Sequence, residues 1–214
     1  MSASTAAKAG LTRTQRRTAE MRQAIIVAAE ELLVEQGQAA LTNEKVAERA
    51  DVSVQTVYNR VGGKSALLIA IAEKALEANR AYMDSAYAAD GTPEQRIRRA
   101  GEAYVRFATD KPHQFQILAN PPDEPDAVGR VAELLREQNG KLAAALRDGI
   151  DAGAVDPRIE PDTAASALWA MMNGALTAML RTDDLRPPPT QVDNLMATAM
   201  TIIENGLRAT ENES

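Results

Sequence analysis

Residues 42–65, TNEKVAERADVSVQTVYNRVGGKS, predict two short helices joined by a turn of a few residues. Thr42 and Ser53 are good N-cap residues, because a side-chain hydroxyl can accept a hydrogen bond from the first turn of a helix. Gly62-Gly63 favours the end of the second helix. We therefore expect helices over residues 42–50 and 54–60, and a longer helix that begins near residue 64.

Helical patterning continues on both sides of this stretch. Apolar residues recur with a period near 3.6, and no segment shows the alternation of a strand or an internal repeat. Thr92-Pro93-Glu94-Gln95 has the form of a capping box with proline at the first helical position. The sequence predicts an all-α protein of about nine helices, the others lying near residues 18–36, 64–88, 92–109, 112–121, 126–152, 163–181 and 190–208.

The composition excludes several classes of protein. Hydrophobic residues make up 45% of the 214-residue chain, which predicts a packed core rather than disorder. The chain has no cysteine and one histidine, so we expect no disulfide, no metal site and no cofactor. No apolar run is long enough for a membrane span, and the N-terminus lacks the apolar core of a signal peptide. These features predict a cytoplasmic protein that is not bound to a membrane.

The charge is unevenly distributed along the chain. The net charge is −6 overall, but residues 1–64 carry nine Lys/Arg and seven Asp/Glu. Residues 1–17 include Lys8, Arg13, Arg16 and Arg17 and no acidic residue. We interpret these residues as a flexible basic arm that, with the following helices, faces a polyanion.

The two short helices have the residue types of a helix-turn-helix. Val46 and Ala47 can pack against Val57, and the small side chain of Ala47 permits close approach. The opposite face of the second helix carries polar side chains that can contact base edges or phosphates. That face consists of Gln55, Thr56, Tyr58, Asn59 and Arg60.

Residues 22–70 resemble the DNA-binding domain of the tetracycline-repressor (TetR) family of bacterial transcription regulators. The matching residues are Ala28-Ala29, Leu32-Leu33, Gly37, Thr42, Val46-Ala47, Ala50, Val52-Ser53, Thr56-Val57-Tyr58, Lys64 and Leu67-Leu68. The resemblance implies a cytoplasmic homodimer with a DNA-binding head and a helical body that encloses a small-molecule pocket. It implies a basic arm over 1–17, a DNA-binding domain over 18–64 and a ligand-binding and dimerisation domain over 65–210.

The resemblance also implies which residues bind operator DNA. Thr42, Tyr58 and Lys64 would contact phosphates, and Gln55 and Thr56 would face base edges. Asn59 and Arg60 lie at positions whose DNA contacts differ from one family member to another. The full expected set is Arg16, Arg17, Thr42, Asn43, Lys45, Ser53, Gln55, Thr56, Tyr58, Asn59, Arg60 and Lys64.

The sequence departs from the family pattern at the two turns. Asp51 replaces a usual glycine, although aspartate tolerates left-handed geometry better than most residues. Val61 stands where an aromatic is common, and Gly62-Gly63 where a polar pair is common. We expect a looser joint with fewer phosphate contacts. An alternative hypothesis is therefore a helical ligand-binding or scaffold protein with weak or vestigial DNA binding.

Two enzymatic interpretations fit poorly. Gly62-Gly63-Lys64-Ser65 looks like the end of a P-loop, but that motif needs a glycine where Tyr58 stands and a strand before it. His113 would be the only histidine for general-base chemistry, and no nucleophile is paired with it by spacing. We expect no enzyme activity and no catalytic residue.

The C-terminal helices predict a pocket and a dimer interface. Pocket candidates are the large or adaptable side chains Tyr104, Phe107, His113, Phe115, Trp169 and Met172. In the family the last two helices form a four-helix bundle with a second subunit. Interface candidates are Leu168, Met171, Gly174, Ala175, Met179, Leu195, Met196, Ala199, Ile202, Ile203 and Gly206. The function expected is a dimeric repressor that binds a palindromic operator and is released by a small molecule.

Overall fold

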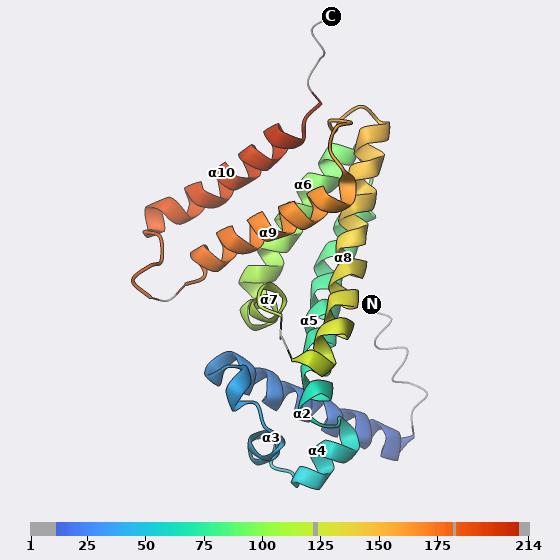
Figure 1. Cartoon of the computed structure of the whole chain (residues 1–214), viewed down its shortest axis with the longest axis vertical. Coiled ribbons are helices and arrows are strands. Elements are labelled where there is room, and N and C mark those ends of the chain that lie inside the picture. Colours follow the sequence, from blue (N-terminus) through green and yellow to red (C-terminus); the bar gives the residue numbers. More distant parts are fainter. Residues whose placement is uncertain (1–11, 122–123, 182, 210–214) are drawn as a thin grey trace, which may run out of the picture. The chain divides into compact units, whose positions relative to one another are not determined.

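The computed structural model describes residues 12–121, 124–181 and 183–209, which form an all-α protein (Figure 1). Apart from one isolated bridge between Val155 and Arg208, these residues contain no β-structure. The helices are α2 Arg13–Gln36, the 3₁₀ turn η1 Gln38–Ala40, α3 Asn43–Arg49, α4 Val54–Arg60, α5 Lys64–Tyr87, α6 Pro93–Asp110, α7 Pro112–Ala119, α8 Pro125–Asp151, α9 Pro161–Met179 and α10 Pro189–Leu207.

The chain divides into two compact units, which we call the head and the body. The head comprises Met1–Glu73 and Pro121–Val131, and the body comprises Lys74–Asn120 and Ala132–Ser214. The division falls inside α5 and α8, so each of these helices contributes residues to both units. The predicted domain boundary at residue 64 instead coincides with the start of α5.

The first helix begins earlier than the sequence analysis predicts. The Thr12 hydroxyl accepts a hydrogen bond from the backbone N–H of Gln15, and the Gln15 side chain accepts one from the N–H of Thr12. This capping box starts α2 at Arg13, so Arg16 and Arg17 belong to a helix and not to a flexible arm. Residues 1–11, which include Lys8, lie outside the described residues.

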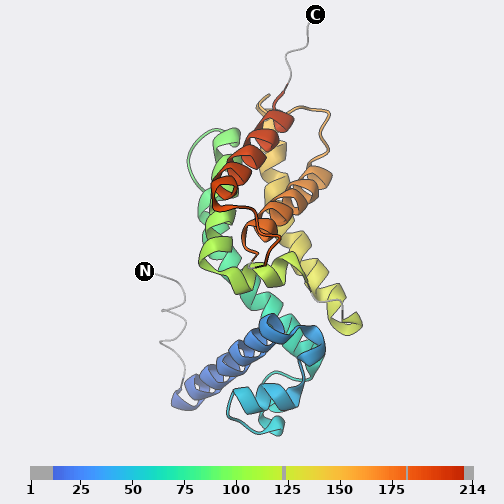
Figure 2. The ribbon, with the colours of Figure 1, turned by 90° about the vertical axis from the view of Figure 1, so that its left-hand side faces the viewer.

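The head has its own apolar core. Ile25 of α2, Val46 of α3, Val57 of α4 and Leu67 of α5 are all fully buried. Figure 2 shows α3 and α4 beside the blue helix α2. These four helices bury one apolar face each, which leaves the opposite face of α4 exposed to solvent.

In the body, α5 and α8 run parallel to each other (Figure 1). Arg80 Nη2 lies 2.8 Å from Glu137 Oε1, and Lys141 Nζ lies 2.6 Å from Asp84 Oδ1. Both pairs join residues 57 positions apart, and a constant offset means that the helices run in the same direction. These partly exposed ion pairs define the register of the two helices but add little to their stability.

The remaining helices complete the body. Phe107 of α6, Phe115 of α7 and Leu176 of α9 are fully buried in its core. Two helix starts differ from expectation: Glu160 caps α9, which begins at Pro161, and α10 begins at Pro189 without a side-chain cap. No helix in the described part of the chain is long and apolar enough to cross a membrane.

Candidate functional site

Side-chain caps position the two helices of the head that carry the predicted DNA contacts. The Thr42 hydroxyl accepts from the backbone N–H of Lys45 at 3.3 Å, which starts α3. The Ser53 hydroxyl accepts from the N–H of Thr56 at 3.1 Å, which starts α4. Between them Asp51 has a φ of 52°, so it occupies the left-handed position where a glycine is usual. The turn keeps its geometry despite this substitution.

The outer face of α4 presents an ordered row of polar groups. Gln55 Nε2 donates to Asn59 Oδ1 at 2.9 Å, and the hydroxyls of Ser53 and Thr56 lie 2.8 Å apart. Tyr58 is 53% exposed, a large fraction for an aromatic side chain. Asn59 and Arg60 are also exposed. This face can therefore donate and accept hydrogen bonds along one helix without any change in the core behind it.

Asn43 lies where it cannot make the predicted DNA contact. Its side chain is buried, with 5% exposure, and its Nδ2 donates to the Gly62 carbonyl at 3.0 Å. The N–H of Gly62 also donates to the Val57 carbonyl at 3.3 Å. Asn43 therefore positions the joint between α4 and α5, and this joint is held by hydrogen bonds rather than loosened by its two glycines.

Lys45 and Lys64, the two lysines of the head among the described residues, have protein partners. Lys64 Nζ lies 3.8 Å from Glu124 Oε2, with the lysine side chain 36% exposed. Lys45 Nζ donates to Gln36 Oε1 at 3.2 Å and is exposed. Both contacts are at the surface, where such interactions are weak and a phosphate can replace the partner. Arg16 and Arg17 are exposed on the first turns of α2.

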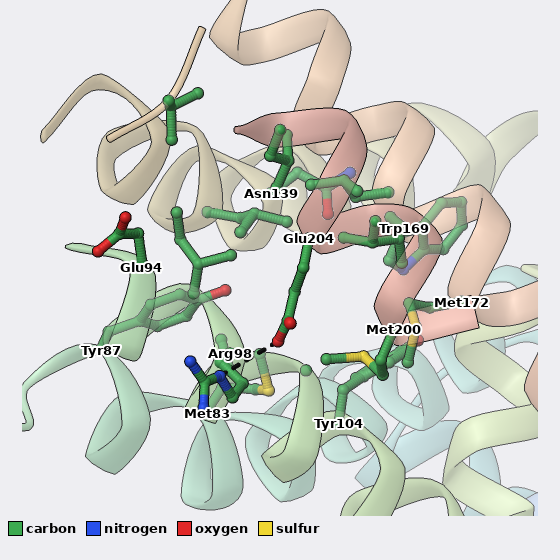
Figure 3. Close-up of a pocket in the computed structure, with 18 of the residues that line it drawn as sticks. Met83, Tyr87, Glu94, Arg98, Tyr104, Asn139, Trp169, Met172, Met200 and Glu204 are labelled. Carbon is green, nitrogen blue, oxygen red and sulfur yellow. Dashed lines mark ion pairs between the residues drawn. The ribbon is translucent and has the colours of Figure 1, made fainter. Parts of the chain in front are cut away.

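The body contains a cavity of about 380 Å³, lined by residues of α5 to α10 (Figure 3). A volume in this range suits a small organic ligand. Tyr104, Trp169 and Met172 line the cavity as predicted. The other three pocket candidates do not. Phe107 and Phe115 are packed in the core with 0% and 1% exposure, and His113 is exposed near the start of α7.

Two tyrosines that line the cavity are in a poor environment for charge. Burial raises the pKa of Tyr104, although a hydrogen bond with Trp169 acts in the opposite direction. Burial also raises the pKa of Tyr87, and the nearby carboxylate of Asp84 adds to that effect. The Tyr104 hydroxyl donates to Asn173 Oδ1 at 2.7 Å in a buried contact. Both phenols are therefore neutral over the physiological pH range.

The charged lining residues are solvent-exposed, and we call them the rim. Arg98 Nε of α6 lies 3.1 Å from Glu204 Oε1 of α10, and Figure 3 shows this ion pair as a dashed line. These side chains are 54% and 42% exposed. Glu94 and Arg208 are the other charged residues of the lining, and both are exposed. The four formal charges cancel.

Two family descriptions match the chain. "Tetracyclin repressor-like, C-terminal domain" matches residues 97–203, and "Bacterial regulatory proteins, tetR family" matches residues 25–71. The chain belongs to the TetR family. This membership confirms the resemblance seen in residues 22–70 and makes the protein a bacterial-type transcription regulator with a helix-turn-helix head. No curated protein matches the chain in sequence.

Solved structures of TetR-family regulators share the fold. A bacterial regulatory protein in the tetR family from Rhodococcus RHA1 is 20% identical, with a TM-score of 0.70 over 89% of this chain and 98% of its own. The transcriptional regulator FadR from Bacillus subtilis, solved in complex with stearoyl-CoA, is 16% identical, with a TM-score of 0.72 over 87% and 99%. The ketosteroid transcriptional regulator KstR2 of Mycobacterium tuberculosis is 15% identical, with a TM-score of 0.66 over 88% and 95%.

The predicted TetR-type dimer interface divides into two sets of residues. Leu168, Met179 and Ile203 are buried within the chain, and Leu168 and Ile203 line the cavity, so these three do not offer a free surface. Met171 and Ile202 are 47% and 58% exposed. The remaining candidates are exposed or half-buried on α9 and α10: Gly174, Ala175, Leu195, Met196, Ala199 and Gly206.

Among the cavity residues that sequence reasoning missed in this TetR-family body are two amides. Asn79 and Gln138 both line the cavity. Each stands in an apolar stripe, Asn79 between Leu76 and Met83 and Gln138 between Leu135 and Leu142, at helical spacing. An amide side chain within an apolar stripe was the sequence signal that could have identified each of these cavity residues. No group of His, Cys, Asp and Glu side chains among the described residues is arranged to hold a metal ion.

Proposed function

We propose that this TetR-family regulator is a dimeric repressor that binds a palindromic operator through α4 and is released by a small molecule in the body cavity. The observation that carries the proposal is the polar outer face of α4 on a buried apolar support. Gln55 and Thr56 would contact base edges, and Tyr58 and Lys64 would contact phosphates. Its place of action would be the bacterial cytoplasm.

The cavity supports the ligand-responsive part of the proposal. Its volume of about 380 Å³ and largely apolar wall suit a small organic molecule. The structural neighbour FadR from Bacillus subtilis was solved with stearoyl-CoA, so one protein of this fold holds an acyl ligand. At 16% identity the two proteins share a fold, and the ligand of this chain requires its own argument.

Exposed apolar residues support the dimer. Met171 of α9 and Ile202 of α10 are large side chains left in solvent on neighbouring helices. A Cβ added at Gly174 or Gly206 would meet nothing within 4 Å, so the same surface has room for a close helix. A two-fold dimer would bury these residues against their own copies. Met171→Glu and Ile202→Glu should each shift the protein towards monomer in sedimentation, whereas Met21→Glu on α2 should not.

Selection of bound duplexes from a random DNA pool tests the proposal as a whole. We expect enrichment of a palindrome whose half-sites are about one helical turn apart. Tyr58→Ala and Lys64→Ala should lower the affinity for the selected duplex, and Lys111→Ala in the body is the control. A dimeric protein that enriches no sequence would favour the alternative of a ligand-binding protein with vestigial DNA binding.

A further inference from the structure

The cavity contains two amide side chains whose hydrogen-bonding groups are not satisfied. Asn79 Nδ2 and Gln138 Oε1 are buried and have no hydrogen-bond partner among the described residues. Asn79 is only 2% exposed, and both residues line the cavity. Buried polar atoms in folded proteins almost always have partners, so each exception calls for an explanation, and one explanation is a bound molecule that completes the site.

The two amides lie at nearly the same level of α5 and α8. Asn79 directly precedes Arg80, and Gln138 directly follows Glu137, and these two neighbours form an ion pair between the helices. With parallel helices offset by 57 residues, the amides are staggered by two positions, or about 3 Å along the axis. One small polar group can therefore interact with both, with modest rotation of the side chains.

The surroundings of these amides determine the charge of that group. A carboxylate or phosphate placed beside them would be removed from water without a cationic partner, which is strongly unfavourable. The arginines of the lining belong to the exposed rim, where Arg98 is already paired with Glu204. A neutral group with a carbonyl acceptor and an N–H or O–H donor matches the pair, since each amide side chain has a donor and an acceptor.

We propose that the cavity binds an uncharged, mainly apolar small molecule whose single amide or hydroxyl-carbonyl group hydrogen-bonds to Asn79 and Gln138. This inference rests on the proposed function only in treating the cavity as the effector site. Acyl-CoA thioesters are not expected to bind in this cavity, because their phosphates would need cations that the cavity wall beside the two amides does not provide. The rim, with no net charge, does not favour an anion either.

The inference can be tested with two compounds of equal chain length, decanamide and decanoate. Trp169 is the only tryptophan of the chain and lines the cavity, so its fluorescence reports binding without DNA. At neutral pH we expect saturable binding of decanamide and binding of decanoate that is about a hundredfold weaker. Asn79→Leu and Gln138→Met should each weaken decanamide binding about tenfold, because one hydrogen bond is lost.

Matched controls keep the result interpretable. Gln116→Met changes an exposed glutamine of α7 and should bind decanamide like the unmodified protein. Circular dichroism should show that Asn79→Leu and Gln138→Met remain folded. The inference is overturned if decanamide does not bind, if decanoate binds as tightly, or if both cavity variants match the control. Decanoate binding that is lost in Arg208→Gln would show that the rim selects an anion.

The same measurements separate this inference from the proposed function. Failure of the protein to bind any selected duplex would contradict the repressor and leave the fluorescence result standing. Release of the operator by decanoate but not by decanamide would support the repressor and contradict a neutral ligand.

Discussion

The outer face of α4 and the inner wall of the body cavity place polar side chains in opposite environments. On α4, Gln55 and Asn59 are exposed and satisfy each other at 2.9 Å, while the fully buried side of the helix is apolar. In the largely apolar cavity, Asn79 and Gln138 each have a buried polar atom without a hydrogen-bond partner among the described residues. A surface of the first kind suits a hydrated polyanion, whereas the second suits a neutral molecule that enters and replaces water.

The largest change in stability should come from a substitution in the apolar core of the body. Phe107→Ala removes a ring with 0% exposure and should cost about 3–5 kcal/mol of unfolding free energy. His113→Ala, at an exposed position of α7, should change stability little. Urea denaturation of both variants checks the distinction between core and surface. Equal stability of the two would contradict the placement of Phe107 in the core.

The joint between α4 and α5 offers a matched pair of glycine substitutions in the head. Gly62 has a φ of 122°, and a Cβ there would lie 2.8 Å from the Cβ of Ala66. Gly62→Ala should therefore cost about 1–3 kcal/mol and weaken operator binding. A Cβ at Gly63 would lie 3.8 Å from the Tyr58 ring, an ordinary contact, so Gly63→Ala should be tolerated. Thermal unfolding and gel-shift titration would show whether the joint is as rigid as its hydrogen bonds indicate.

The unsatisfied amides of the cavity predict a gain of stability on substitution. Asn79→Leu keeps the number and branching of the side-chain heavy atoms, and the larger leucine can extend into the cavity that Asn79 lines. The substitution removes a buried, unpaired polar group, so the ligand-free protein should gain about 1 kcal/mol. Decanamide binding should fall in the same variant. A loss of stability would mean that the Asn79 side chain is satisfied in the folded protein, and the contrast with α4 would disappear.

Acid should cause the smallest change in stability among these predictions, and that change should arise in the loop before α9. Hydrogen bonds from the Arg158 side chain, and to a lesser extent from its backbone N–H, lower the pKa of Asp156 to about 2, from an ordinary value of 3.8. A depressed pKa in the folded state stabilises the protein above the unfolded value, and this contribution is lost as the pH falls from about 4 to about 2. Asp156→Asn should flatten this part of the stability profile. If the dependence of stability on pH is the same in Asp156→Asn, the pair of Asp156 and Arg158 contributes nothing to stability.

The helices and the head could be predicted well because their signals are local. The caps at Thr42, Ser53 and Thr92 lie within three residues of the groups they bind. The capping box of Thr12 and Gln15 was missed because the first turns of α2 are exposed and lack apolar periodicity. The T-x-x-Q spacing was present in the sequence and, given weight, would have placed the helix start correctly.

The cavity could be predicted only in part because it depends on residues far apart in the chain. Large apolar side chains serve equally well as core or as cavity wall, so Phe107 and Phe115 could not be separated from Trp169 and Met172 by type. Burial of Asn43 depends on its contact with Gly62, nineteen residues later. Such outcomes follow from tertiary packing, which local propensity does not encode.

The most direct test of the central claim is the salt dependence of binding to the selected duplex for the unmodified protein, Lys64→Ala and the control Lys111→Ala. If Lys64 contacts a phosphate, its substitution should weaken binding to all duplexes and lower the slope of log K against log salt by about one. Lys111→Ala should keep the original slope. Identical slopes and affinities for all three proteins would contradict the phosphate contact of Lys64 and, with it, the placement of DNA at the start of α5.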